Sequence, residues 1–195
     1  NKATNITLKQ AAEFLIGHDN FLVLSHANPD GDTEGCAYGL CGALQRLGKK
    51  ARLACSDPLS ERFSYMEEAV EKQQFEESFV VSVDVADRSL LGGLEKLYGD
   101  KVDLAIDHHL SHRPFAERVY VDDSAAAACE IIYDLIKLLK AECLDEKIAK
   151  CLYTGIATDT GCFKFGNTTR HTHLKAGELM EYGFDAAALN YVLFD

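Results

Sequence analysis

Aspartate and histidine side chains recur at four places in the sequence, each after a segment predicted to be regular structure. These places are Ser25–Asp32, Asp84–Asp87, Asp107–His109 and Thr158–Gly161. They supply six candidate metal ligands: His26, Asp30, Asp32, Asp84, His108 and Asp159. Carboxylate oxygens and imidazole nitrogens are ligands for divalent cations such as Mn²⁺ and Mg²⁺. The pattern therefore predicts a metal site assembled from distant parts of the chain.

The density of negative charge in these segments favours more than one cation. Like charges a few Å apart raise one another's pKa, so clustered carboxylates need a counter-ion to stay ionised together. Two ions need about six protein ligands, and one shared carboxylate can bridge ions roughly 3.5–4 Å apart. We therefore expect two cations, with Mn²⁺ as the first candidate and Mg²⁺ as the second.

Each segment taken alone also has a structural explanation. Asn28-Pro29-Asp30-Gly31 has the composition of a good turn, and we expect Asp87 and Asp122 to be helix caps or turn residues. The remaining histidines are expected outside the site, with His18 at a helix end, His112 in a loop, and His171 and His173 on the surface. The metal-site hypothesis therefore rests on the occurrence of all four segments together at predicted strand or helix ends, and not on any single segment.

Short apolar runs alternating with helical patterns predict the elements that position these residues. Strands are expected at 21–25, 51–55, 79–83, 102–106, 118–121 and 162–165. Helices are expected at 7–17, 33–47, 125–140, 145–157 and 169–182, with 60–73 helical or irregular. Continuously apolar strands between helices are typical of an α/β domain, a parallel β-sheet flanked by helices. Ligands of such sheets bind beyond the carboxyl ends of the strands, so the four segments should meet at one rim.

Composition limits the classes of partner. The 195 residues carry a formal net charge of -11, which disfavours a duplex-DNA surface because such binding depends on neutralising phosphates. Short oligonucleotides or mononucleotides remain suitable partners, because bound cations reverse the charge locally.

No apolar run approaches the roughly 18 residues of a membrane span. With no secretory signal, we expect a cytoplasmic protein that does not bind membranes. The seven cysteines form no C-x-x-C pair and are expected to be reduced core thiols.

The four segments, in this order, resemble the motifs of the DHH phosphoesterase family. The first is Ser25-His26-Ala27-Asn28-Pro29-Asp30-Gly31-Asp32, the second Val83-Asp84 with Asp87, the third Asp107-His108-His109, and the fourth Gly155-Ile156-Ala157-Thr158-Asp159-Thr160-Gly161. The resemblance covers nearly the whole chain. The branch it most resembles is that of the nano-RNases and phosphoadenosine phosphatases, which Phe163–Thr169 and Asp123-Ser124-Ala125 also resemble.

The resemblance implies a role for each candidate residue. His26, Asp30 and Asp84 would hold one ion, whereas Asp32, Asp84, His108 and Asp159 would hold the other, with Asp84 bridging. Among catalytic residues, His109 would face the phosphate as an electrostatic or acid/base group, and Asp107 would orient the imidazoles. Asn28, Ser124 and Asn167 would contact substrate. Cys36 departs from the family, in which serine is expected, and little effect on metal binding is anticipated.

The resemblance also implies an organisation and an activity. Residues 1–195 would form a single DHH catalytic domain. The glycine-rich motif of the substrate-binding DHH-associated domain is absent, so we expect a piece of a longer protein. The implied function is a hydrolase in which two metal ions activate a hydroxide to cleave short oligonucleotides or small nucleotide phosphates. Alternatives are a single-strand DNA exonuclease, a pyro- or polyphosphatase, or a catalytically idle nucleotide-binding module. Family members often form homodimers.

Overall fold

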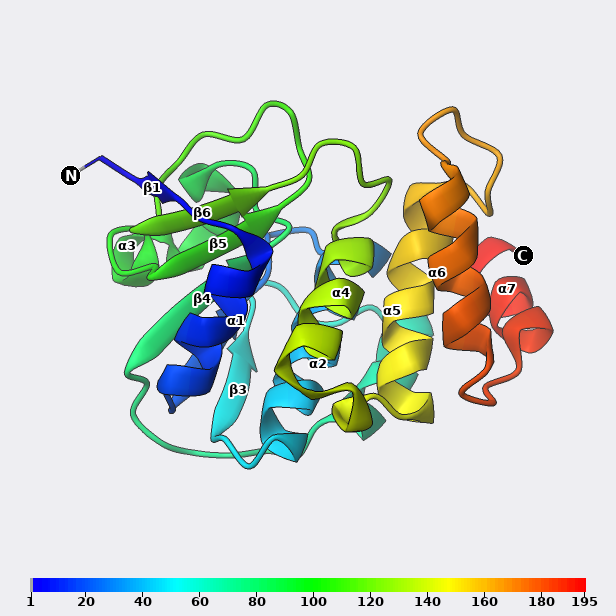
Figure 1. Cartoon of the computed structure of the whole chain (residues 1–195), viewed down its shortest axis with the longest axis horizontal. Helices are drawn as coiled ribbons and strands as arrows, with labels where there is room; N and C mark the ends of the chain where they lie inside the picture. The colour runs from blue at the N-terminus through cyan, green and yellow to red at the C-terminus, as the bar shows by residue number, and fades with distance from the viewer. Residues whose placement is uncertain (1) are drawn as a thin grey trace.

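Six strands form one sheet in the order β1-β6-β5-β4-β2-β3, and every neighbouring pair is parallel (Figure 1). The computed structural model describes residues 2–195. The strands are β1 (Thr4–Asn5), β2 (Phe21–Leu24), β3 (Ala51–Ala54), β4 (Phe79–Val83), β5 (Leu104–Asp107) and β6 (Arg118–Val121). The predicted parallel sheet flanked by helices is confirmed.

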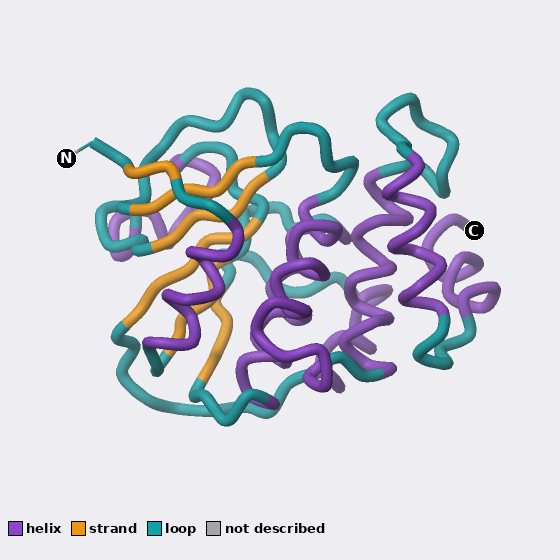
Figure 2. Tube along the Cα trace, viewed as in Figure 1, coloured by secondary structure: helices purple, strands orange, loops and turns teal. Residues whose placement is uncertain are grey.

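Helices lie on both sides of the sheet and extend beyond it. The α-helices are α1 (Leu8–Gly17), α2 (Gly31–Arg46), α3 (Glu95–Tyr98), α4 (Ala128–Lys140), α5 (Glu146–Asp159), α6 (Arg170–Met180) and α7 (Ala186–Phe194). Three 3-10 helices are η1 (Glu61–Ala69), η2 (Arg88–Leu94) and η3 (Ala141–Cys143). Figure 2 shows the strands at one end of the molecule and α4 to α7 toward the other.

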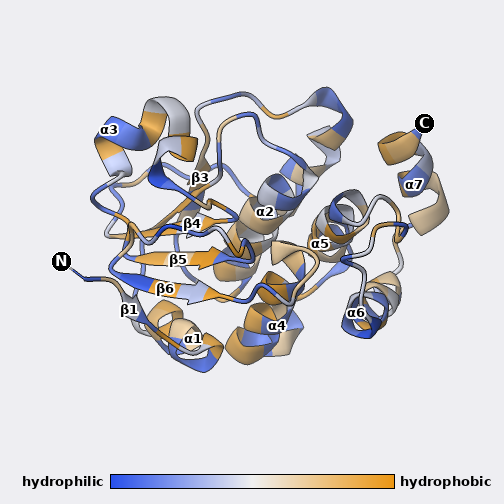
Figure 3. Ribbon diagram, turned by 90° about the horizontal axis from the view of Figure 1, so that it is seen from above, coloured by the Kyte–Doolittle hydropathy of each residue, from blue (hydrophilic) through white to orange (hydrophobic). Residues whose placement is uncertain are grey.

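Both faces of the sheet are buried, as its apolar strands predict. Successive side chains of a strand point to opposite faces. Accordingly, Phe21 and Val23 of β2 join the main core with α1, α2, α4 and α5, whereas Leu22 and Leu24 join a second cluster with Leu91 of η2. Figure 3 shows α1 and α4 on one side of the strands and α3 on the other. The sheet is therefore a rigid platform whose strand ends can position side chains.

Close packing of α2, α4 and α5 brings three helices together near the strand ends. At Gly35 of α2, a Cβ atom would lie 2.5 Å from the carbonyl oxygen of Cys151. At Gly155 of α5, a Cβ atom would overlap Cys129 Sγ and lie 2.8 Å from Asp32 Oδ1. Glycine is therefore needed at both positions for these helix backbones to approach.

Most predicted elements agree with the structure to within a few residues, and one predicted strand is wrong. Residues 162–165 form a turn, because Gly161, Cys162 and Phe163 have φ values of 57°, 58° and 66°, outside the range of extended backbone. Strand β1 and helix α7 were not predicted.

Two further expectations concern cysteines and membranes. Five of the seven cysteines are buried and all seven are free thiols, in agreement with core cysteines. Within residues 2–195, none of the helices combines the length and apolar character that crossing a membrane requires.

Candidate metal centre

The loop after β2 places the first predicted ligands. Asp30 is the N-cap of α2, and its Oδ1 accepts hydrogen bonds from the backbone N–H groups of Asp32 and Thr33 at 3.1 and 2.9 Å. His26 Nδ1 lies 2.7 Å from the carbonyl oxygen of Ala27, so Nδ1 carries the proton and donates it. The free Nε2 then lies 3.6 Å from Asp30 Oδ1 and 3.8 Å from Asp84 Oδ2.

Asp84 occupies the middle of the site. It follows β4, is 2% exposed, and has a φ of 60°, a conformation that few non-glycine residues adopt. Its backbone N–H donates to the carbonyl oxygen of Ile106 at 2.9 Å, which fixes it against β5. Asp84 Oδ1 lies 3.3 Å from His108 Nε2 and 3.6 Å from His109 Nδ1. Because Oδ2 faces His26, the two oxygens of Asp84 face histidines from different loops.

His108 links Asp84 to two further carboxylates. Its Nδ1–H donates to the carbonyl oxygen of Ala125 at 3.0 Å, which directs Nε2 toward the carboxylates. His108 Nε2 lies 3.5 Å from Asp32 Oδ2 and 3.3 Å from Asp159 Oδ2. Asp159 is the last residue of α5, two residues later than the sequence predicted for the helix end.

The N-terminus of α4 holds Asp32. Both carboxylate oxygens accept backbone hydrogen bonds, Oδ2 from Ala128 at 2.8 Å and Oδ1 from Cys129 at 2.9 Å. The positive end of the helix dipole favours an anion at this position. Cys36 Sγ lies 3.8 Å from Asp32 Oδ1 and 3.5 Å from Cys129 Sγ, so this departure from the family adds only a weak donor.

The structure brings all six predicted ligands together in two adjoining groups. One comprises His26, Asp30 and Asp84, and the other Asp32, His108 and Asp159, with the donor atoms of each group within 4.8 Å of one another. Asp84 Oδ1 and His108 Nε2 are buried and have no hydrogen-bond partner among residues 2–195. Leaving such atoms unpaired costs about 1–3 kcal/mol each. The carboxylate and imidazole donors fit divalent cations, which would pair with these atoms.

The ionisation of these groups reflects their crowding. Burial raises the pKa of Asp84 to about 6, partly offset by the His108 imidazole that faces it. Burial and the neighbouring Asp84 charge raise the pKa of Asp32 well above its usual range. Burial lowers the pKa values of His26 and His108, but the carboxylates beside each ring outweigh it and raise these pKa values to about 9 and about 11. Without metal, the histidines therefore hold protons that partly balance the carboxylates.

Asp107 forms a second arrangement beside the ligands. It is wholly buried, and its Oδ1 accepts from His109 Nδ1 and its Oδ2 from His112 Nδ1, each at 2.7 Å. Burial raises the pKa of Asp107, but the two histidine hydrogen bonds outweigh it and bring the pKa below its usual range. The hydrogen bond with Asp107 in turn raises the pKa of His109, whose side chain is 41% exposed. Asp107 therefore lies where an orienting residue for His109 is expected.

The part of His112 in this arrangement was missed from the sequence. His112 does lie in a loop, as predicted, but its side chain is only 4% exposed and contacts Asp107. The available signal was a histidine five residues after Asp107, which does not reveal whether the side chain turns inward.

Each of the three predicted substrate contacts makes a hydrogen bond within the chain, Asn28 through its backbone and the other two through their side chains. The backbone N–H of Asn28 donates to Asp57 Oδ2 at 2.6 Å. Ser124 Oγ donates to Asp122 Oδ1 at 2.6 Å, and Asn167 Nδ2 donates to the carbonyl oxygen of Asp159 at 3.0 Å. Their contact with substrate stays a prediction.

Several acidic and histidine side chains lie outside the two groups. Asp87 caps η2 by accepting from the backbone N–H of Ser89 at 2.9 Å, and Asp122 accepts from that of Ser124 at 3.0 Å. Both are thus the cap and turn residues that were predicted. His18 ends α1, and His171 and His173 are exposed, also as predicted.

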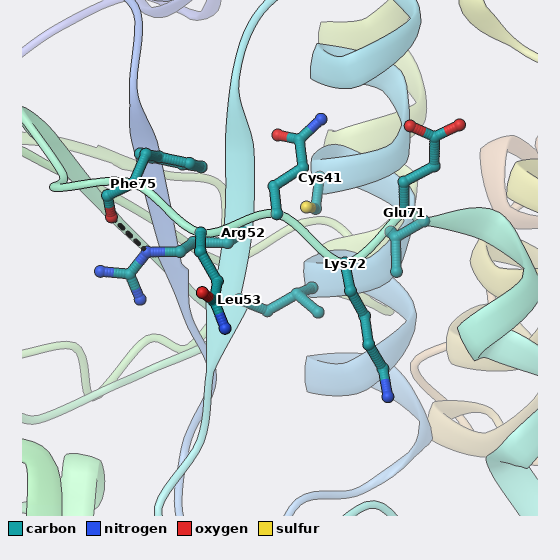
Figure 4. Close-up of a pocket in the computed structure, with 9 residues that line it drawn as sticks. Cys41, Arg52, Leu53, Glu71, Lys72 and Phe75 are labelled. Carbon is teal, nitrogen blue, oxygen red and sulfur yellow. Dashed lines mark hydrogen bonds between the residues drawn. The ribbon is translucent and has the colours of Figure 1, made fainter.

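A separate pocket of about 420 Å³ lies along the outer edge of β3, away from the ligand residues (Figure 4). Arg52, which lines it, donates to the carbonyl oxygen of Phe75 at 3.2 Å and pairs with Glu77. The Arg52 guanidinium is therefore already engaged within the chain.

Comparison with known proteins agrees with the motifs. The family description "DHH family, N-terminal domain" matches residues 20–156. The bifunctional oligoribonuclease and PAP phosphatase NrnA of Bacillus subtilis is 32% identical over 91% of this chain and 58% of its own length. The NrnA of Thermus thermophilus is 38% identical over 86% of this chain and 51% of its own length. The chain thus spans about half the length of these curated relatives.

A solved structure supports the fold. An exopolyphosphatase-related protein from Bacteroides fragilis superimposes with a TM-score of 0.84, covering 96% of this chain and 59% of that one. At 18% identity, this likeness extends to the fold alone.

Proposed function

Because the chain belongs to the DHH family, we propose that it is the catalytic part of a metal-dependent phosphoesterase that hydrolyses short oligonucleotides or small nucleotide phosphates. The observation that carries the proposal is the position of Asp84, whose two oxygens face His26 on one side and His108 on the other. One buried carboxylate is thereby available to both donor groups. The similarity to the NrnA proteins supports this choice of substrate class.

The proposed ligand sets follow the two groups. His26, Asp30 and Asp84 would hold one cation, and Asp32, Asp84, His108 and Asp159 the other. When bound, such cations lower the pKa of a coordinated water and draw charge from phosphoryl oxygens. We propose Mn²⁺ as the native metal, with Mg²⁺ as the alternative, because the donor set mixes imidazole with carboxylate.

His109 is the proposed catalytic residue contributed by the protein itself. Asp107 accepts its Nδ1–H, so the other ring nitrogen, Nε2, is left for a substrate at the exposed side of the ring. The raised pKa keeps more of the ring protonated near neutral pH. A protonated His109 can stabilise negative charge on the phosphoryl group or give a proton to the leaving oxygen.

The remaining parts of the proposal concern organisation and location. We propose that substrate choice depends partly on a DHH-associated domain of a longer protein. Seven free thiols support a reducing compartment such as the cytoplasm. Exclusion of duplex DNA and formation of homodimers stay predictions.

The test is hydrolysis with Mn²⁺ of three substrates: phosphoadenosine phosphate and pyrophosphate, followed by release of inorganic phosphate, and a dinucleotide, followed by formation of mononucleotides. The 195-residue chain is assayed beside the proposed longer protein. We expect hydrolysis of phosphoadenosine phosphate and of the dinucleotide. Cleavage of pyrophosphate alone would replace the proposal with a pyrophosphatase. Nucleotide binding without turnover by either protein would replace it with an idle binding module.

A further inference from the structure

His112 is held in place by its backbone as well as by its side chain. Its N–H donates to the carbonyl oxygen of His109 at 3.0 Å, which closes a tight turn. The next residue, Arg113, donates its N–H to the carbonyl oxygen of Ala86 at 2.8 Å. The turn is therefore fastened to the loop that follows Asp84.

The side chain of His112 completes the hydrogen bonding of Asp107. Oδ1 of that carboxylate has two donors, the backbone N–H of His108 at 2.8 Å and His109 Nδ1. Oδ2 has His112 Nδ1 as its one hydrogen-bond donor within residues 2–195. Without His112, a wholly buried carboxylate oxygen would lose its partner. Asp107 would then rotate or take up a proton, and either change would loosen its hold on His109.

We propose that His112 is a positioning residue for the phosphoester reaction, because its hydrogen bond to Asp107 fixes the carboxylate that orients His109. The inference rests on the proposed function. It adds a residue that the family motifs seen in this chain do not include, and it assigns the role to the Nδ1–H group in particular.

A packing role is the competing explanation. The His112 ring lies 6.1 Å from the Phe115 ring, centroid to centroid, at an interplanar angle of 30°. His112 Nε2, however, is buried without a hydrogen-bond partner in the described part of the chain. An apolar side chain would fill the same space without burying an unpaired nitrogen. Packing alone therefore does not explain a histidine here, whereas the bond to Asp107 does.

Two substitutions separate these explanations. His112→Leu fills the space without a donor, whereas His112→Asn provides an N–H group near the position of Nδ1. His18→Asn is the matched control, because His18 also makes a 2.7 Å Nδ1 hydrogen bond, to the carbonyl oxygen of Phe14 in α1. We measure kcat and KM for a dinucleotide with Mn²⁺. His112→Leu should lower kcat about 10- to 100-fold, the range for residues that orient a catalytic group. KM should change little, and His112→Asn should recover most of the loss.

A second readout does not depend on turnover. In the 195-residue chain without metal, at a pH high enough for the His109 ring to be neutral, NMR of ¹⁵N-labelled histidines reports which ring nitrogen of His109 carries the proton. The wild type and His112→Asn should show His109 protonated at Nδ1, and His112→Leu should show a mixture of forms.

Two results would overturn the inference. His112→Leu could leave both kcat and the His109 signals unchanged, or His112→Asn could be as impaired as His112→Leu. Absence of turnover in the wild type would count against the phosphoesterase function, and the NMR comparison would still decide the role of His112.

Discussion

Replacing Asp84 with Asn removes one carboxylate from both donor groups while preserving the size of the side chain. A cation at 100 times its Kd stabilises a folded protein by about 2.7 kcal/mol, and in a domain of this size 1 kcal/mol changes Tm by about 2–4 °C. Each saturated site should therefore raise Tm by about 5–11 °C. Two sites should give about twice that increase. Asp84→Asn should lose most of the increase, because both groups lose a ligand.

Asp30→Asn is the matched control, since Asp30 belongs to one donor group only. It should keep about half of the Mn²⁺-dependent rise in Tm, on the same linkage estimate. The assay is thermal unfolding with increasing Mn²⁺, referred to the metal-free Tm of each variant. A rise in Asp84→Asn as large as that in Asp30→Asn would refute the idea that Asp84 serves both groups.

Three further predictions follow from the same geometry. Mn²⁺ must displace protons from His26 and His108, whose pKa values are raised to about 9 and about 11, so the affinity for Mn²⁺ should rise from about pH 6 to about pH 9. Calorimetry in several buffers should detect the released protons. An affinity that does not change with pH would contradict this prediction. His109→Gln should lower kcat about 100-fold or more in phosphate-release assays, because His109 is proposed to act on the substrate. Most of the Mn²⁺-dependent rise in Tm should remain, because His109 is not a proposed metal ligand. An unchanged kcat would remove His109 from the mechanism. Gly155→Ala should lower the free energy of unfolding by about 1–3 kcal/mol through overpacking. The control is Gly177→Ala on α6, where a Cβ atom meets open space, and this substitution should raise the free energy of unfolding by about 0.5–1 kcal/mol. Equal effects of the two substitutions in denaturant titrations would contradict the helix packing.

Features that depend on local sequence pattern could be predicted, and the convergence of the ligands followed from them. The run at 21–24 is apolar at every position and the run at 79–83 at all but Ser82, so they indicated strands buried on both faces. Because parallel strands end at the same edge, Asp30, Asp84 and His108 were expected to meet there. This step uses only topology, and for this reason it succeeded without any knowledge of side-chain contacts.

Features that depend on backbone strain or tertiary contact could not be predicted in this way. Phe163 and Phe165 alternate with other residues as in a strand, but three consecutive positive φ values make this segment a turn. Strand β1 has two residues, too few for any pattern. Helix α7 is an exception, because its sequence did hold a signal that was missed. This signal is the capping residue Asp185, which accepts a hydrogen bond from the backbone N–H of Ala188. The inward turn of His112 depends on the burial of Asp107, which no spacing rule reveals.

The most direct test of the account is dinucleotide hydrolysis by the proposed longer protein, wild type against Asp84→Asn, with Mn²⁺ and then with excess chelator. The account predicts turnover in the wild type with Mn²⁺, loss of that turnover on chelation, and little turnover in Asp84→Asn. Chelator-insensitive hydrolysis, or wild-type turnover in Asp84→Asn, would contradict a phosphoesterase centre built around Asp84.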